Sequence, residues 1–325
     1  MIEFHSSPNP TIGVEIELQL IDDNTLDLKN ISSKVLADID KKFCNRMKYE
    51  LFESMIEINT DICSTIEEVE GDIKQTLRHL EEVLKNYNAS INCSSLHPFA
   101  RGKNQIISND SRYKRIMNDL QIIGTRFITQ GLHVHIGIDE CEKVIKVNNA
   151  LRIYLPLLLA LSTSSPFYEG EDTGLYSYRT KIFESLPLAG MPDYLNNWDH
   201  FTNITENLIK ANVIRSVKDL WWEVRPHPSF GTVEIRICDI PVSLKQILAL
   251  VALMQALVVT IQNLDKYPDT HIQILESNKW QAVRYGLEGT FIDPLTLKQL
   301  PMKKAIEDLC NLIEPAMLAL GSAKY

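Results

Sequence analysis

The sequence predicts an α+β fold, in which an antiparallel sheet carries helices on one face and leaves the other face open. Four segments alternate apolar with polar residues, which is typical of strands buried on one face only. Parallel sheets usually bury both faces, so this alternation favours antiparallel pairing. No repeat, low-complexity tract or long linker divides the sequence, and we therefore expect one domain over residues 1–325.

The first strand is expected over residues 11–21, where Ile12, Val14 and Ile16 alternate with Glu15 and Glu17. A second is expected over 49–59, although its glutamates also fit helical spacing. The third and fourth are expected over 131–138 and 232–238, and a shorter one over 221–225. Together these segments supply the predicted sheet.

Helices are expected between the strands. Ser64 and Glu67 match a capping box, which predicts a helix from there to about residue 87. Further helices are expected over 111–123, over 143–162 with a kink at Pro156, and over 244–264. The C-terminal part is expected to be helical with a turn near Asp293. Segment 166–192, rich in Gly, Tyr, Ser and Pro, is expected to be a loop that is either a lid or an ordered connection.

Composition excludes some classes of function. The net charge of −9 and the pI near 5.4 argue against binding to nucleic acid or to an anionic membrane. Six scattered cysteines form no CxxC pair, and we expect reduced thiols in a cytoplasmic protein. The N-terminus lacks the pattern of a signal peptide. Segment 247–261 is apolar, but it is short for a membrane span and Gln255 interrupts it, so a buried core helix is expected.

The open face of the predicted sheet would concentrate charged and imidazole side chains. Residues two apart on a strand share a face, so Glu15 points with Glu17, and His133 with His135. Massed carboxylates repel one another unless cations neutralise them, and hard oxygen ligands favour Mg²⁺, Mn²⁺ or Ca²⁺. The full set on this face is Glu15, Glu17, Glu53, Glu57, His133, His135, Glu234 and Arg236.

Arg236 shares the face with Glu234, and an arginine beside metal-binding glutamates suits contact with a phosphate. The combination favours phosphoryl transfer, in which metals and cations stabilise charge on the transferred group. Taken singly, each pair is more often a solvated or structural feature. His133, His135 and a glutamate could instead hold Zn²⁺ or Fe²⁺ in a hydrolase, and a non-catalytic nucleotide- or partner-binding protein also stays open. There is no P-loop and no GxSxG motif.

At these residues the sequence resembles the glutamate–cysteine ligase type 2 family, also called YbdK-like carboxylate–amine ligases. The resemblance covers nearly the whole chain and rests on long, ordered motifs. The matching stretches are GVEIE at 13–17, ELFESMIE at 50–57, GLHVHIG at 131–137, LLALS at 158–162, SSPF at 164–167, DTG at 172–174, SYR at 177–179, WWEVRPHP at 221–228, GTVEIRICD at 231–239, NKW at 278–280 and RYG at 284–286.

The resemblance implies a glutamine synthetase-like catalytic fold with a curved, mostly antiparallel sheet and helices packed outside. It implies ATP-dependent phosphorylation of a carboxylate, with glutamate expected, followed by attack of an amine, either cysteine or another amino compound. Mg²⁺, with Mn²⁺ as the alternative, would be the metal, and a homo-oligomer is an expectation. The family usually continues past Tyr325 into a further helical segment with a basic tail.

The resemblance also assigns roles to residues. Glu50 is among the expected metal ligands although strand alternation puts it on the other face, so a bulge or bend must intervene. The expected metal ligands are Glu15, Glu17, Glu50, Glu53, Glu57, His133 and Glu234. The residues expected at the nucleotide are Arg179, Arg225, Glu234 and Arg236, and those expected to be catalytic are Glu15, Glu57 and Arg236.

Overall fold

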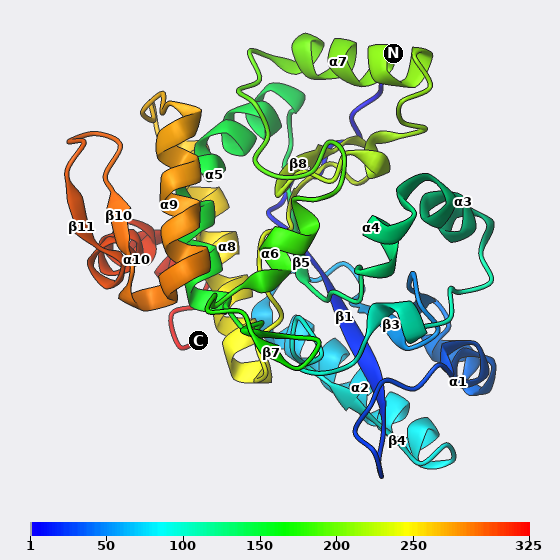
Figure 1. Cartoon of the computed structure of the whole chain (residues 1–325). Helices are drawn as coiled ribbons and strands as arrows, with labels where there is room; N and C mark the ends of the chain where they lie inside the picture. The colour runs from blue at the N-terminus through cyan, green and yellow to red at the C-terminus, as the bar shows by residue number, and fades with distance from the viewer. Residues whose placement is uncertain (1) are drawn as a thin grey trace.

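The computed structural model describes residues 2–325, and its centre is a seven-stranded sheet (Figure 1). The strand order is β2-β3-β1-β5-β9-β8, and β4 pairs with β1 beside this path. Every pairing in this sheet is antiparallel. The strands are β1 (Ile12–Asp22), β2 (Met47–Tyr49), β3 (Met55–Asn59), β4 (Ala89–Asn92), β5 (Leu132–Gly137), β8 (Val224–His227) and β9 (Thr232–Ile235). The predicted α+β class with a mostly antiparallel sheet is confirmed.

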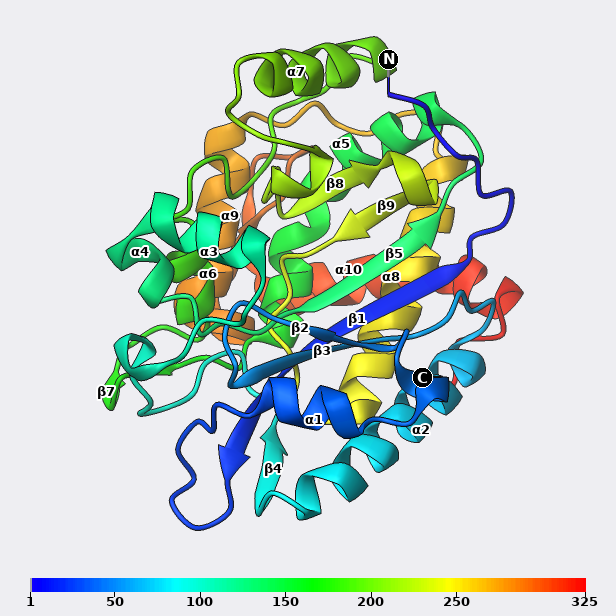
Figure 2. The same ribbon diagram turned by 90° about the vertical axis from the view of Figure 1, so that its right-hand side faces the viewer.

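Long helices cover one face of the sheet, as predicted from the alternation. The apolar residues of β1, including Ile12, Val14 and Ile16, are buried in the core that forms between the sheet and these helices. In Figure 2, α8 and α10 lie behind the sheet. The helices on this side are α2 (Ile66–Lys85), α5 (Cys141–Ser162), α8 (Leu244–Asn263), α9 (Ile272–Tyr285), which packs on α5, and α10 (Met302–Ala319), which packs on α8.

Two of these helices, α5 and α8, are long and apolar enough to cross a membrane by length and composition alone. The most apolar stretch of α5 is 83% buried inside the fold, and that of α8 is 67% buried. Segment 247–261 lies within α8 and is a core helix, as expected. Pro156 lies inside α5, and the kink expected there stays a prediction.

Shorter elements border the other side and the ends of the sheet. Thr65 is the N-cap of α2, because its side chain accepts a hydrogen bond from the amide of Glu68. The helix therefore begins one residue later than the predicted capping box of Ser64 and Glu67 implied. The shorter helices are α1 (Ser32–Asp38), α3 (Ser111–Leu120), α4 (Ile122–Thr125), α6 (Tyr178–Phe183) and α7 (Trp198–Lys210), and the two small hairpins are β6 (Phe167–Tyr168) with β7 (Glu171–Asp172) and β10 (Thr290–Ile292) with β11 (Gln299–Pro301).

Several predicted boundaries were wrong. The strand expected over 49–59 is broken, because residues 50–54 leave the sheet and Phe52 packs into a separate apolar cluster with Met55 and Ile128. The helix over 111–123 is interrupted at Gln121, whose φ of 51° no helix accommodates. Segment 166–192 is not a plain loop, since it contains the β6–β7 hairpin and α6.

Near the C-terminal half, the short strand predicted at 221–225 lies at 224–227, and the strand predicted to reach Cys238 ends at Ile235. The region around Asp293 forms the β10–β11 hairpin rather than a simple turn between helices. All six cysteines are free in the described residues 2–325, and their reduced state in the cell stays a prediction.

Candidate active site

The sheet face opposite the long helices is the floor of a cavity of about 290 Å³. Strands β1, β3, β5, β8 and β9 contribute its floor, while α3 and α6 contribute walls. These walls cover the face that alternation predicted to be open, and His133 and Glu234 are consequently buried. The charged side chains therefore meet in a partly desolvated cleft, where electrostatic interactions are stronger than in water.

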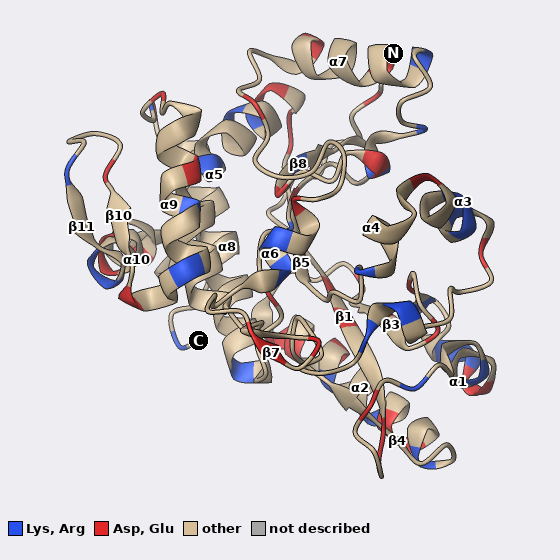
Figure 3. Cartoon of the chain, in the orientation of Figure 1, with Lys and Arg blue, Asp and Glu red and all other residues tan. Residues whose placement is uncertain are grey.

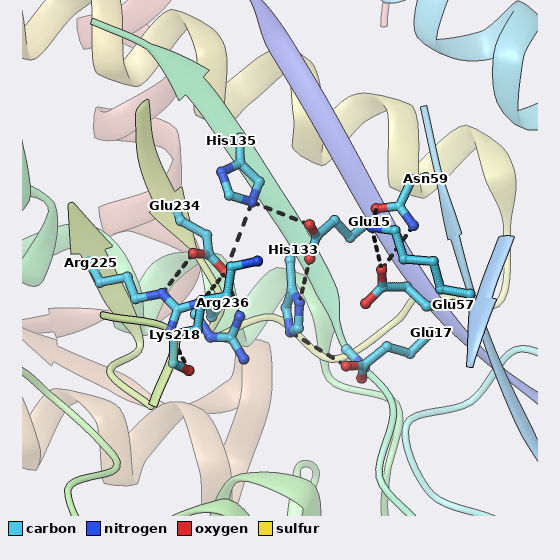
Figure 4. Close-up of polar contacts among 12 residues, drawn as sticks. Glu15, Glu17, Glu57, Asn59, His133, His135, Lys218, Arg225, Glu234 and Arg236 are labelled. Carbon is cyan, nitrogen blue, oxygen red and sulfur yellow. Dashed lines mark hydrogen bonds and ion pairs between the residues drawn. The ribbon is translucent and has the colours of Figure 1, made fainter. Parts of the chain in front are cut away.

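A first group of possible metal ligands consists of Glu15, His133 and Glu234, whose ligand atoms all lie within 4.8 Å of one another. The register explains the group, because Glu15 is paired with His133 across β1 and β5. Glu15 Oε2 lies 3.4 Å from His133 Nδ1, and Glu15 Oε1 lies 3.5 Å from His135 Nε2 (Figure 4). Burial raises the pKa of Glu15, but hydrogen bonds with the two histidines outweigh it and hold this pKa well below its usual range.

A second group consists of Glu17, Glu50 and Glu57, again with ligand atoms within 4.8 Å of one another. Glu17 and Glu57 are register partners on β1 and β3. Glu50 reaches them from the segment that follows β2, so the bend that the resemblance required does exist. Glu17 Oε2 also accepts a hydrogen bond of 2.6 Å from the amide of Gly131, which fixes the carboxylate against β5.

Among residues 2–325, the cation that pairs with this second group is Lys48, which is mostly exposed. Lys48 Nζ lies 3.5 Å from Glu57 Oε1 and is exposed at the rim. Burial, with the nearby charge of Glu15, raises the pKa of Glu57 to about 7. Burial, with the charges of Glu17 and Glu57, raises the pKa of Glu50 well above its usual value. Three carboxylates held so close, with oxygen atoms only, fit a hard divalent cation such as Mg²⁺ or Mn²⁺.

Two arginines bracket Glu234 on the other side of the cleft. Arg225 Nε donates to Glu234 Oε2 at 2.7 Å and Nη2 donates to Oε1 at 3.2 Å, while Nη1 donates to the carbonyl of Leu220 at 2.8 Å. Arg236 Nη1 also donates to Glu234 Oε1, and Arg236 Nε is buried without a partner among the described residues. Burial raises the pKa of Glu234, but the two arginines outweigh it and keep this carboxyl ionised. All three guanidinium nitrogens of Arg225 thus donate hydrogen bonds, whereas Arg236 Nε has no acceptor among the described residues.

Arg179 lies behind Arg236. Its Nη1 donates to the carbonyl of Ile237 at 3.2 Å and its Nη2 to the carbonyl of Arg236 at 3.3 Å. Gly131 makes room for it, because a Cβ there would lie 2.3 Å from Arg179 Nη2. Figure 3 shows the basic residues of α6 in blue. Arg179 lines the cleft, but the contacts of its guanidinium orient the main chain of Arg236.

Glu53 is the one predicted ligand that the structure does not bring to either group. Its carboxylate accepts from Ser32 Oγ at 3.0 Å and from the amide of Ser33 at 2.9 Å, at the first turn of α1. It does not line the cleft. The alternation that placed Glu53 beside Glu57 fails because residues 50–54 are not part of a strand.

Several cleft residues were not assigned a role from the sequence. Lys48, Arg112 and Lys218 add positive charge around the cleft, and His227 stacks on Phe230 with ring centroids 4.1 Å apart. Burial, despite the nearby charge of Glu234, lowers the pKa of His227 to about 4. The sequence predicts a helix over 111–123, but nothing in that prediction showed that α3 faces the cleft. The apolar wall consists of Ile116, Leu120, Phe127, Phe183, Leu186 and Trp221.

Solved structures with the same fold include ligases. The glutamate–cysteine ligase of Francisella tularensis in complex with AMP superposes with a TM-score of 0.72 over 96% of this chain and 79% of its own, at 14% identity. A bifunctional glutathione synthetase from Pasteurella multocida gives a TM-score of 0.69 over 96% of this chain and 47% of its own, also at 14% identity. These matches confirm the fold predicted from the resemblance.

Sequence relatives give the family. The family model for glutamate–cysteine ligase family 2 matches residues 11–325, and the chain belongs to this family. A protein of Gloeobacter violaceus, provisionally named glutamate–cysteine ligase 2, is 39% identical over all of this chain and 89% of its own length. A relative from Frankia casuarinae, provisionally named glutamate–cysteine ligase 2-1, is 37% identical over 98% of this chain and 86% of its own.

Proposed function

We propose that this chain, as one catalytic domain over residues 1–325, uses ATP to convert a carboxylate into an acyl phosphate, which an amine then attacks to give an amide. The observation that carries the proposal is the pair of ligand groups on the cleft floor, with Glu15 and Glu17 of β1 contributing one member to each and Arg236 beside the first. Membership of a ligase family supports the same reaction.

The donor set fits two divalent cations, which we propose to be Mg²⁺, with Mn²⁺ as the alternative. Glu17, Glu50 and Glu57 would hold one cation, and Glu15, His133 and Glu234 the other. Bound there, the metals would neutralise charge on the nucleotide phosphates. The six ligands come from four strands and the segment after β2, so the folded sheet holds them in place before any substrate binds.

The remaining residues would orient the reacting groups. Glu234 aligns Arg236 through a direct ion pair, and the guanidinium keeps free donors that suit the equatorial oxygens of a transferred phosphoryl group. Arg225 holds Glu234 from the opposite side, so we propose that it acts through Glu234 rather than on the nucleotide. The walls of α3 and α6 would limit the access of water, which would otherwise hydrolyse an acyl phosphate.

The substrates are proposed from the relatives. The names of the relatives point to glutamate as the carboxylate and cysteine as the amine, and we propose glutamate with cysteine or another amino compound. Lys48, Arg112 and Lys218 in the cleft offer positive charge for a substrate carboxylate. We propose a cytoplasmic enzyme that acts on small molecules rather than nucleic acid or membranes, in keeping with its net charge of −9. A homo-oligomer stays a prediction.

The test is a screen for ADP release over pairs of amino acids and amines, with mass spectrometry of the product. ADP release is expected only when both partners are present. Glu15→Gln and Glu234→Gln should abolish it while the circular dichroism spectrum is unchanged. Glu171→Gln, an exposed position in the β6–β7 hairpin, is the matched control and should keep full activity. ATP turnover that ignores both carboxylate and amine would contradict the proposal.

A further inference from the structure

Lys279 of α9 is a buried cation outside the cleft that the proposed reaction does not use. Its side chain is only 3% exposed, yet it meets three carboxylates. Lys279 Nζ lies 3.1 Å from Glu184 Oε1, 3.1 Å from Glu223 Oε1 and 2.9 Å from Glu276 Oε2. Glu276 is on the same helix, but Glu184 follows α6 and Glu223 precedes β8. One ammonium group therefore joins three separate segments.

We call Lys279 and its three carboxylates, Glu184, Glu223 and Glu276, the hub. Glu223 connects this hub to the cleft through its main chain. Its amide donates to the carbonyl of Gly190 at 2.9 Å, and its carbonyl accepts from the amide of Arg236 at 2.8 Å. That bond continues the β8–β9 pairing beyond Ile235, where β9 ends. Arg179 holds the carbonyl of Arg236 on the other side. The two main-chain groups of Arg236 are thus held by the segments that Lys279 ties together.

Stability alone is a poor reason for such a hub. A buried ion cluster rarely stabilises a protein more than apolar side chains of the same volume would, because each charge loses its hydration. What such a cluster does provide is a defined geometry, since the ammonium group holds its partners only at hydrogen-bonding distance. Burial raises the pKa of Glu223, and one oxygen of this carboxylate has no hydrogen-bond partner within residues 2–325. The ion pair with Lys279 therefore offsets part of the free-energy cost of burying the Glu223 carboxylate.

We propose that Lys279 is a positioning residue, which acts through Glu223 to fix the main chain of Arg236 and hence the direction of its guanidinium in the cleft. The functional part of this inference rests on the proposed ligase reaction, in which Arg236 meets the nucleotide phosphates. The geometric part, control of the Arg236 main chain by Lys279, does not depend on that reaction.

Hydrogen exchange of the full chain, measured by mass spectrometry, tests the geometric part. In Lys279→Met, exchange in the peptide that spans 233–240 should become about tenfold faster or more, because the Arg236 amide loses its fixed acceptor. Peptides from β1 should not change. Lys279→Arg should restore most of the protection, because it keeps the charge. Lys181→Met is the matched control: Lys181 also pairs with Glu184 but does not touch Glu223, so 233–240 should stay protected.

Glu223→Gln provides a milder variant in case Lys279→Met does not fold, since it removes only the charge of Glu223 and leaves the carboxylates of Glu184 and Glu276 on Lys279. It should accelerate exchange in the same peptide, and in a folded double variant the two effects should not add. Unchanged exchange at 233–240 in folded variants, or an equal rise in β1 peptides, would overturn the inference.

The ADP-release assay distinguishes a failure of the ligase proposal from a failure of the proposed role of Lys279. In the ADP-release assay Lys279→Met should lower kcat about tenfold or more with an unchanged KM for the amine, as expected when only the transition state loses a contact. Lys279→Arg should recover most of this kcat, and Lys181→Met should match the unsubstituted chain. If the unsubstituted chain releases no ADP, the ligase proposal fails while the exchange result still decides the geometric part. Faster exchange with an unchanged kcat would overturn the link to Arg236 in the reaction.

Discussion

Replacing Glu57 by glutamine should stabilise the metal-free protein at alkaline pH. Burial and the charge of Glu15 raise the pKa of Glu57 from an ordinary 4.5 to about 7. Each pKa unit corresponds to about 1.4 kcal/mol, so ionising this carboxyl costs the folded state about 3 kcal/mol. Glutamine removes the charge and retains the side-chain oxygen, which accepts a 2.8 Å hydrogen bond from Asn59 Nδ2.

The sign follows from proton binding. Between the unfolded pKa near 4.5 and the folded pKa near 7, the native protein binds the extra proton, so its stability falls as pH rises through this window. Above pH 7 the full cost of about 3 kcal/mol applies, and Glu57→Gln should be more stable than the unsubstituted chain by up to that amount. At pH 4 the two proteins should have equal stability.

The assay is urea unfolding in EDTA at pH 4, 6 and 8, repeated at pH 8 with Mg²⁺. Mg²⁺ should stabilise the unsubstituted chain, because a ligand that binds only the native state raises its stability, and it should stabilise Glu57→Gln much less. Glu53→Gln is the control: its carboxylate accepts hydrogen bonds at the start of α1, so this variant should lose stability at pH 8 by about 1 kcal/mol. A Glu57→Gln variant that is destabilised at pH 8, or equally responsive to Mg²⁺, would refute the reasoning.

Three further changes test other parts of the structure. Arg225→Lys keeps the charge but cannot reproduce the paired hydrogen bonds to Glu234, and urea unfolding at pH 7.5 should show a loss of about 3 kcal/mol; equal midpoints would contradict it. Burial lowers the pKa of His97, whose Nδ1 accepts from a main-chain amide, so stability should fall as pH decreases through about 6.5. The variant His97→Asn should show a flatter pH dependence of unfolding over pH 7.5 to 5.5, and an identical slope would argue against this role. Gly231→Ala should lower the free energy of unfolding by about 3 kcal/mol in thermal melts, because φ is +64° and a Cβ would lie 1.7 Å from the carbonyl oxygen of His5; an unchanged melting temperature would show that the backbone can adjust.

The parts of the site that lie on regular strands could be predicted from the sequence. Strand alternation is a local property, so it correctly placed Glu15 with Glu17 and His133 with His135 on one face. It also showed which side of β1 faces the long helices. The register that brings Glu15 next to His133 does not follow from alternation, because a shift of two residues would bury the same faces.

The rest of the site depends on contacts between distant segments. Glu50 and Glu53 lie in the segment 50–54, where Phe52 packs against residues far along the chain, so the alternation gave Glu53 to the cleft and Glu50 to the opposite face. The structure reverses both placements. The family resemblance named Glu50, but it also kept Glu53 among the ligands. Likewise, the sequence predicts a helix over 111–123, and only the tertiary fold shows that α3 borders the cleft.

The central strand β1 sets a fixed distance in the cleft. Glu15 belongs to one ligand group and Glu17 to the other, and residues two apart on an antiparallel strand are separated by about 7 Å. A pleated strand that is paired on both sides cannot stretch, so β1 holds the two groups at a constant separation. A charged substrate must therefore fit the existing distance between the two groups, because its binding cannot change that distance. Deleting Ile16, the residue between these two glutamates, would turn one of them into the apolar core, so the length of this short stretch is fixed.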